Sequence, residues 1–198
     1  MKRIFTFVLT AAAVISMTAC SLSERISASR RNGLGMGFSA EASIVIDRLE
    51  AEGTVKRFGE GAWEIEFSAP NTLSGVKLEF SEGNVLASYK GLSFSVPQSA
   101  IPVKAMMLNL IKAVEDNAKA EELTGEESDG LLKVKGSLDG GDYMLTVDEN
   151  GLLNAFEMPN NKLTMRFTDM KTADITAEQT ATDVTVETTS VISTVTTA

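Results

Sequence analysis

Residues 63–67 read WEIEF, and this stretch decides the fold class because large apolar residues alternate with acidic ones. Successive side chains of a β-strand point to opposite faces, so a period of two predicts a strand with one buried and one wet face. Residues 76–80, VKLEF, repeat the arrangement, and Gly59 and Gly61 supply a turn before the first stretch. The pattern therefore predicts antiparallel strands joined by hairpins.

The same alternation extends along most of the chain on either side of this stretch. It covers residues 44–46, 49–58, 85–89, 92–96, 132–135, 143–147, 152–158 and 163–167. Glycine-containing turn sequences separate these stretches at the spacing of a meander or a barrel. Mainly β structure is predicted, with a small helical contribution (α+β).

One amphipathic helix is predicted after these first strands. Its apolar residues follow the i, i+3, i+4, i+7, i+11 spacing of a single helical stripe, and they are Met107, Leu110, Ile111, Val114 and Ala118. The polar face carries both acidic and basic residues, whereas membrane-surface helices have a basic one. We therefore expect this helix to lie on the apolar face of the sheet.

An acidic run follows the helix. Residues 121–129 contain five carboxylates, and their spacing does not match a calcium-binding EF-hand loop. We interpret this run as a solvated loop.

The N-terminus has the pattern of a lipoprotein signal. Lys2 and Arg3 precede an uncharged apolar segment, residues 4–17, which is too short to span a bilayer core of about 30 Å. Residues 17–20, MTAC, end in Cys20, the only cysteine of the chain. The pattern predicts a signal peptide over residues 1–19 and a lipid on Cys20. It predicts an extracytoplasmic protein anchored to the cell membrane by that lipid.

The segments that flank the predicted domain differ from it in composition. Residues 20–37 are polar and rich in glycine, and are predicted to form a lipidated N-terminus with a flexible tether. Residues 171–198 are rich in threonine and acidic, and are predicted to be a mostly disordered tail. Within this tail, residues 183–195 have some β-propensity, which leaves an extra edge strand open. The folded domain is then expected over residues 38–170.

Composition also restricts the function. The net charge of −9 becomes −11 once Lys2 and Arg3 are removed, which argues against nucleic acid as a partner. The chain contains no histidine, so the common Ser-His and Cys-His nucleophile arrangements are excluded and most transition-metal sites are disfavoured. We predict a protein that is not an enzyme and that has no metal or cofactor.

Three segments resemble strands of the lipoprotein-carrier superfamily, which includes LolA/LolB-like carriers and receptors. They are residues 61–67 followed by Pro70, residues 83–89, and residues 91–97. The likeness covers residues 38–169 and is closest to uncharacterised lipoproteins of Gram-positive anaerobes (Clostridia). It implies a curved, half-open antiparallel β-barrel covered by a helix. Some members of this superfamily hold acyl chains, and others bind an envelope protein.

The apolar residues that face the predicted interior are the candidate ligand site. They are Trp63, Ile65, Phe67, Leu78, Phe80, Tyr89, Phe94, Met107, Leu110, Ile111 and Val114. The residues alone leave two readings open, a filled core and a cavity for an acyl chain. With the resemblance, we predict a membrane-tethered lipoprotein that binds a hydrophobic ligand, either an acyl chain or a lipid. The alternative is a regulatory module that docks an envelope protein.

Overall fold

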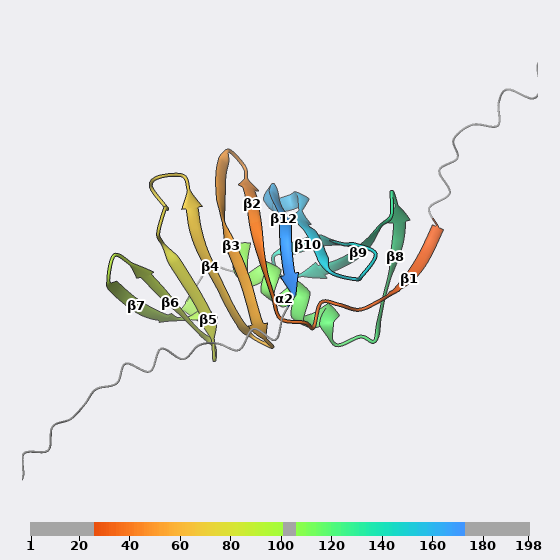
Figure 1. Ribbon diagram of the computed structural model, residues 1–198, viewed down its shortest axis with the longest axis horizontal. Coiled ribbons are helices and arrows are strands. Elements are labelled where there is room, and N and C mark those ends of the chain that lie inside the picture. The colour runs from red at the N-terminus through yellow and green to blue at the C-terminus, as the bar shows by residue number, and fades with distance from the viewer. Residues whose placement is uncertain (1–25, 101–105, 173–198) are drawn as a thin grey trace, which may run out of the picture.

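The computed structural model describes residues 26–100 and 106–172, which form one twelve-stranded antiparallel sheet and one α-helix (Figure 1). The strands are β1 (Ile26–Arg31), β2 (Phe38–Ile46), β3 (Leu49–Gly59), β4 (Ala62–Ala69), β5 (Lys77–Ser81), β6 (Asn84–Tyr89), β7 (Leu92–Pro97), β8 (Glu122–Ser128), β9 (Leu131–Leu138), β10 (Gly141–Val147), β11 (Leu153–Met158) and β12 (Leu163–Thr172). The helices are α2 (Met106–Ala118) and two short 3-10 turns, η2 (Gln98–Ala100) and η3 (Pro159–Asn161).

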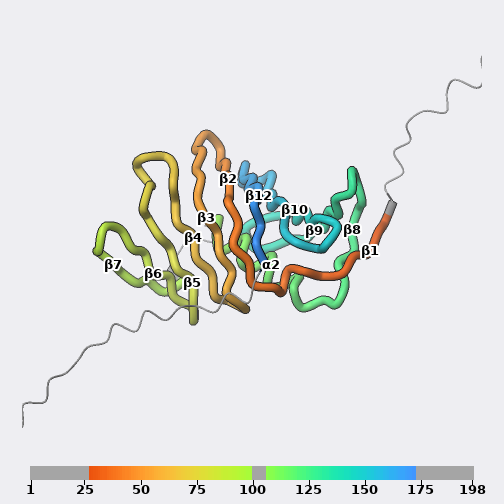
Figure 2. Tube along the Cα trace, in the orientation of Figure 1, coloured from red at the N-terminus to blue at the C-terminus, as the bar shows by residue number. Residues whose placement is uncertain are grey.

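The sheet is curved but does not close. Its strand order is β1-β8-β9-β10-β11-β12-β2-β3-β4-β5-β6-β7, so β1 and β7 are the two edges. Figure 2 shows these edge strands at opposite ends of the molecule, with α2 beneath the middle of the sheet. This arrangement confirms the predicted mainly β fold and is consistent with a half-open barrel.

Tight turns join neighbouring strands and fix their register. In the β5–β6 turn, Glu82 and Gly83 have φ of 49° and 76°, and in the β6–β7 turn Lys90 and Gly91 have φ of 49° and 82°. Two consecutive residues with positive φ form the turn that matches the natural twist of a two-residue hairpin. The resulting register places Trp63 opposite Phe80, and Phe80 opposite Val85, on the inner face.

The core lies between α2 and the inner face of the sheet. On the helix, Leu110 and Val114 of the predicted apolar stripe are completely buried, and so is Ala113, which the predicted stripe did not include. They belong to one cluster with the inner-face residues of the strands, including Ile65, Phe156 and Met165. The alternation in residues 63–67 is confirmed, because Trp63, Ile65 and Phe67 are all buried.

The predicted flexible tether is wrong for residues 26–37. Strand β1 pairs with β8 along its whole length, from Ile26 opposite Glu127 to Arg31 opposite Glu122. Leu34 follows and is part of the core, with 1% of its surface exposed. The polar sequence concealed this strand because its stability comes from pairing with a distant segment and not from local propensity.

The acidic run after the helix is likewise a strand and not a loop. β8 pairs with β1 on one side and β9 on the other, and Leu123 is its buried anchor. A side chain at Gly125 would collide with the Lys133 carbonyl of β9, so the close approach of these strands requires glycine there.

Strands among the described residues therefore extend from Ile26 to Thr172, beyond the predicted domain bounds of 38–170 at both ends. Lys171 and Thr172 are the last residues of β12. The predicted signal peptide, Cys20 and the rest of the predicted tail lie outside the described residues.

Candidate functional site

A buried arginine joins the helix, the sheet and the N-terminal segment. Arg57 lies near the end of β3 with only 2% of its surface exposed. Its Nε and Nη2 donate to the two carboxylate oxygens of Glu115 on α2, at 3.1 and 2.9 Å. Its Nη1 donates to the carbonyls of Gly35 and Met36, at 2.6 and 3.3 Å. This bidentate geometry holds α2 at a fixed position on the sheet.

Glu115 accepts further hydrogen bonds from strand β4 and the turn before it. The indole Nε1 of Trp63 donates to Oε1 at 2.8 Å, and the backbone N–H of Gly61 donates to the same atom at 3.3 Å. The Arg57 guanidinium carbon also lies 5.9 Å from the centroid of the Trp63 ring, within cation–π range. We call Arg57, Glu115 and Trp63 the helix clamp.

The helix clamp changes the acidity of Glu115. Burial alone would raise the pKa of this carboxyl, but hydrogen bonds from Arg57 and Trp63, the charge of Arg57 and the Gly61 N–H outweigh burial. The pKa of Glu115 is therefore held below its usual value, and the carboxylate form is stabilised.

This shift predicts an acid-dependent loss of stability. Because the pKa is lower in the folded state, the contribution of Glu115 is fully present above the unfolded pKa of about 4.3 and is lost as pH falls through the folded value. We expect wild type to be more stable than Glu115→Gln at pH 7, and the difference to shrink over the acid range below about pH 5. Urea unfolding of both proteins across this range measures the difference. A constant difference would contradict the assigned ionisation.

The segment before β2, residues 32–37, is hydrogen-bonded to the C-terminal end of α2. Asn32 Nδ2 donates to the carbonyls of Asn117 and Ala120 at 2.9 and 2.6 Å. The N–H of Gly33 donates to the Gly151 carbonyl at 3.2 Å. Together with the bonds from Arg57, these contacts make the segment a strap that connects β1 to the helix clamp.

The apolar inner face of the sheet continues beyond the helix and becomes exposed. One row runs from Ile65 across Leu78 and Ala87 to Phe94, through the paired strands β4 to β7. Ile65 is completely buried, whereas Phe94 is 65% exposed. On the same face, Leu92 is 77% and Tyr89 40% exposed. We call Leu78, Ala87, Tyr89, Leu92 and Phe94 the apolar shelf.

The structure divides the predicted cavity residues into three groups. The buried ones are Trp63, Ile65, Phe67, Phe80, Met107, Leu110 and Val114. Leu78 and Ile111 are half-buried. The expectation that all share one interior is wrong for Tyr89 and Phe94, because α2 lies over the middle of the sheet and not over β6 and β7.

Arg57 and Glu115 were missed from the sequence, although a signal for Arg57 exists. Ala51, Val55 and Arg57 occupy positions of the same parity in β3, so an arginine at the third of them had to point inward with the other two. A charge on an inward position requires a partner of opposite charge. Only the fold identifies this partner as Glu115.

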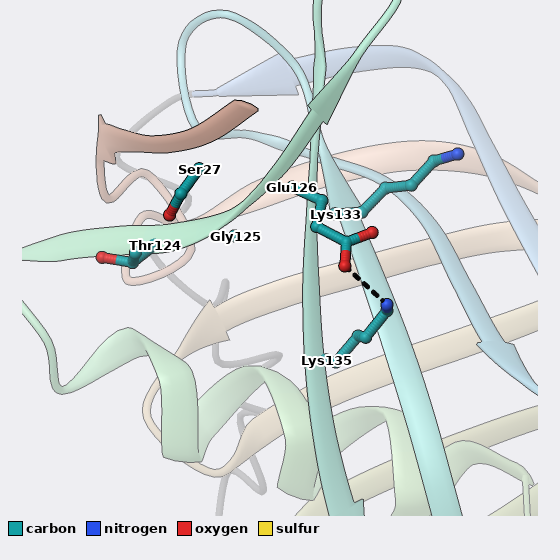
Figure 3. A pocket seen from close by; sticks show the side chains of 6 residues that line it. All are labelled: Ser27, Thr124, Gly125, Glu126, Lys133 and Lys135. Atoms are coloured by element: carbon teal, nitrogen blue, oxygen red, sulfur yellow. Dashed lines mark hydrogen bonds and ion pairs between the residues drawn. The ribbon is translucent and has the colours of Figure 1, made fainter. Parts of the chain in front are cut away.

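Two surface pockets formed by described residues contain none of the predicted cavity residues. One has a volume of about 440 Å³ and is lined by Ser27, Thr124, Gly125, Glu126, Lys133 and Lys135. Figure 3 shows Lys135 turned toward Glu126, and Lys135 Nζ donates to Glu126 Oε1 at 2.9 Å. The other, of about 250 Å³, is lined by Ser43, Val45, Glu50, Ala51, Glu52, Ala69 and Pro70. Neither includes a residue of the apolar shelf.

Among residues 26–100 and 106–172, no helix has the length and apolar character to cross a membrane. In the same part of the chain, no three acidic, histidine or cysteine side chains lie close enough together to hold a metal ion.

No protein-family model matches the chain, and no curated protein matches it either. Three solved structures show a distant likeness. An uncharacterized conserved protein from Thermus thermophilus has a TM-score of 0.47 and 14% identity, covering 72% of this chain and 82% of that one. A LolA superfamily protein from Nitrosomonas europaea has a TM-score of 0.36 and 9% identity, covering 73% and 90%. A DUF1329 family protein from Desulfovibrio piger has a TM-score of 0.35 and 12% identity, covering 70% and 86%.

Proposed function

We propose that this protein is a membrane-tethered lipoprotein that binds a hydrophobic ligand, of the acyl-chain or lipid class, on the concave face of its half-barrel. The observation that carries the proposal is the apolar shelf. Its residues lie on the same face as the buried core, and Tyr89, Leu92 and Phe94 are exposed on β6 and β7. A relation to lipoproteins of Gram-positive anaerobes and an extracytoplasmic location belong to the same proposal.

The shelf has the chemistry of a surface for acyl chains. Phe94 and Leu92 are largely exposed, and Ser93 and Ser95 on the same strand alternate to the opposite face. Contiguous exposed apolar surface in a soluble domain marks a site of interaction. Each methylene that moves from water onto such a surface contributes about 0.8 kcal/mol, so an acyl chain lying along the Leu78–Phe94 row gains affinity with its length.

The test of ligand binding is uptake of a fluorescent fatty acid by the delipidated protein. We expect wild type to bind the probe and Phe94→Ser to weaken binding about tenfold or more, because burying one phenyl ring is worth about 1.5–3 kcal/mol. Ser93→Thr is the matched control, because Ser93 lies on the same strand with its side chain on the other face. Unchanged affinity in Phe94→Ser would remove the shelf from the site.

The alternative function is docking of an envelope protein. The same exposed shelf suits an apolar surface of a partner, and the uptake experiment separates the two. A wild-type protein that takes up no fatty acid and carries no co-purified lipid in mass spectrometry would contradict ligand binding and favour docking.

Anchoring through Cys20 is tested separately. We expect Cys20→Ser to release the protein from the membrane fraction, because acyl chains on this residue supply the binding free energy. Membrane fractions washed with high salt and probed for the protein measure this. Retention of the variant would show that another part of the chain holds it.

A further inference from the structure

Strand β7 forms one edge of the described sheet. It is the last strand in the order of the sheet, so among the described strands only β6 pairs with it. Its sequence, LSFSVP, contains no charged residue. Natural sheet edges are commonly shielded by charges, bulges or a covering segment, because their free N–H and C=O groups recruit other strands. Leu92 and Phe94 on this edge are also largely exposed.

The register shows which backbone groups of β7 have no partner among the described residues. The two-residue turn at Lys90 and Gly91 makes Tyr89 and Leu92 a hydrogen-bonded pair, and such pairs recur at every second residue. The N–H of Gln98 donates to the Gly83 carbonyl at 2.8 Å, which fits this alternation. The even-numbered residues of β7 therefore bond to β6. Ser93 and Ser95 direct their N–H and C=O groups outward.

We propose that the edge of β7 pairs with β7 of a second copy of this chain, antiparallel and with a two-fold axis at Phe94. In this register Ser93 of one copy faces Ser95 of the other, and these are the residues whose backbone groups point away from β6. Leu92 faces Val96, and Phe94 faces its own counterpart. The strand is thus self-complementary, since its apolar-Ser-Phe-Ser-apolar pattern reads alike in both directions.

The side chains of this pairing also match. Phe94 and its counterpart form a pair without backbone hydrogen bonds, the type in which opposing side chains approach most closely. Leu92, Phe94 and Val96 of both copies lie on the inner face, so the two apolar shelves become continuous. A two-fold axis of this kind makes the interface closed and limits the assembly to two copies.

The proposed interface is small, so the dimer is expected to form only at high protein concentration. Pro97 has no N–H, so regular pairing ends beyond Ser95. The whole interface contains four backbone hydrogen bonds, and each copy contributes three apolar side chains. The surface area that they bury falls short of the roughly 1,000 Å² that stable interfaces bury. The dimer is therefore weak and concentration-dependent in solution, and confinement of both copies to one membrane would raise their effective concentration.

The experiment uses the chain with Cys20→Ser, so that an introduced cysteine is its only thiol. Phe94→Cys is expected to form a disulfide-linked dimer under mild oxidation, because residue 94 meets its counterpart at the axis. Ser93→Cys is the control, because its counterpart lies diagonally about 7–8 Å away and outside disulfide reach. Equal cross-linking of the two variants would mean random collision and would overturn the proposal.

A second variant tests the pairing without altering any shelf residue. Ser95→Pro removes an N–H that points away from β6, so the monomer keeps its fold. We expect it to weaken self-association, measured by sedimentation equilibrium, about tenfold or more, while Ser95→Ala leaves it unchanged. Circular dichroism shows that each variant is folded.

Hydrogen exchange decides what occupies the edge. We expect the Ser93 and Ser95 amides to become protected only at concentrations at which the dimer forms, and the Phe94 amide to be protected always. Protection of all three at every concentration would place a segment of the same chain on the edge. Protection of neither serine at any concentration would leave the edge open. Either result overturns the proposal.

Discussion

Arg57→Met is expected to lower the free energy of unfolding by about 3–5 kcal/mol. The substitution removes both bonds to Glu115 and leaves a carboxylate that is 13% exposed without its cation. It also removes the donor that serves the carbonyls of Gly35 and Met36. A buried charge and two carbonyls left without partners make this change far larger than the loss of a surface ion pair. Urea unfolding at pH 7 measures it.

Lys162→Met is the matched control for this prediction. Lys162 Nζ and Asp47 Oδ1 are 2.6 Å apart, but both side chains are more than half exposed. Loss of this pair is expected to change stability by less than about 1 kcal/mol. The double variant Arg57→Met with Glu115→Leu should recover part of the loss, because it no longer buries a lone carboxylate. Equal effects of Arg57→Met and Lys162→Met would contradict the role assigned to the helix clamp.

Trp63→Ala is expected to destabilise the domain by about 3–5 kcal/mol. The indole is 1% exposed and its ring meets Phe38 edge-on, with centroids 5.5 Å apart. Truncation leaves a large void and also removes the Nε1 donor from Glu115. The loss is comparable to the whole stability of many domains, so the unfolding midpoint is measured in urea at low temperature.

Two further variants separate the contributions of Trp63. Trp63→Phe keeps most of the ring but not the hydrogen bond, and is expected to cost about 1–3 kcal/mol. Glu66→Ala changes an exposed residue on the opposite face of β4 and should alter stability by less than about 0.5 kcal/mol. Similar unfolding midpoints for Trp63→Ala and Glu66→Ala would mean that the two faces of β4 are misassigned.

The sequence predicted the strands whose side chains carry the pattern themselves. β4 alternates large apolar and acidic residues, so its inner face could be identified without the fold. β1 and β8 carry little apolar content, and they become strands because each completes the hydrogen bonding of the other. This information lies in a pairing between segments almost a hundred residues apart, which no local pattern contains.

The same limit applies to the candidate site. The sequence identifies the apolar residues, but alternation alone does not show which part of the sheet the helix covers. Phe94 and Trp63 were therefore both expected to be buried. Likewise, Arg57 and Glu115 are 58 residues apart and come together only through the packing of α2 on β3. The sequence therefore indicates the composition of the inner face, and the fold determines which part of that face is open.

The position of β1 has a consequence for how far this domain can move from a membrane. Only five residues separate Cys20 from the start of β1 at Ile26, a reach of about 20 Å at full extension. The tether expected from composition, ending at residue 37, would have allowed about 60 Å. With lipid on Cys20 as proposed, the half-barrel stays beside the leaflet that anchors it. A ligand or partner then has to arrive at that membrane surface, because the short tether does not allow the protein to carry a ligand to a second membrane.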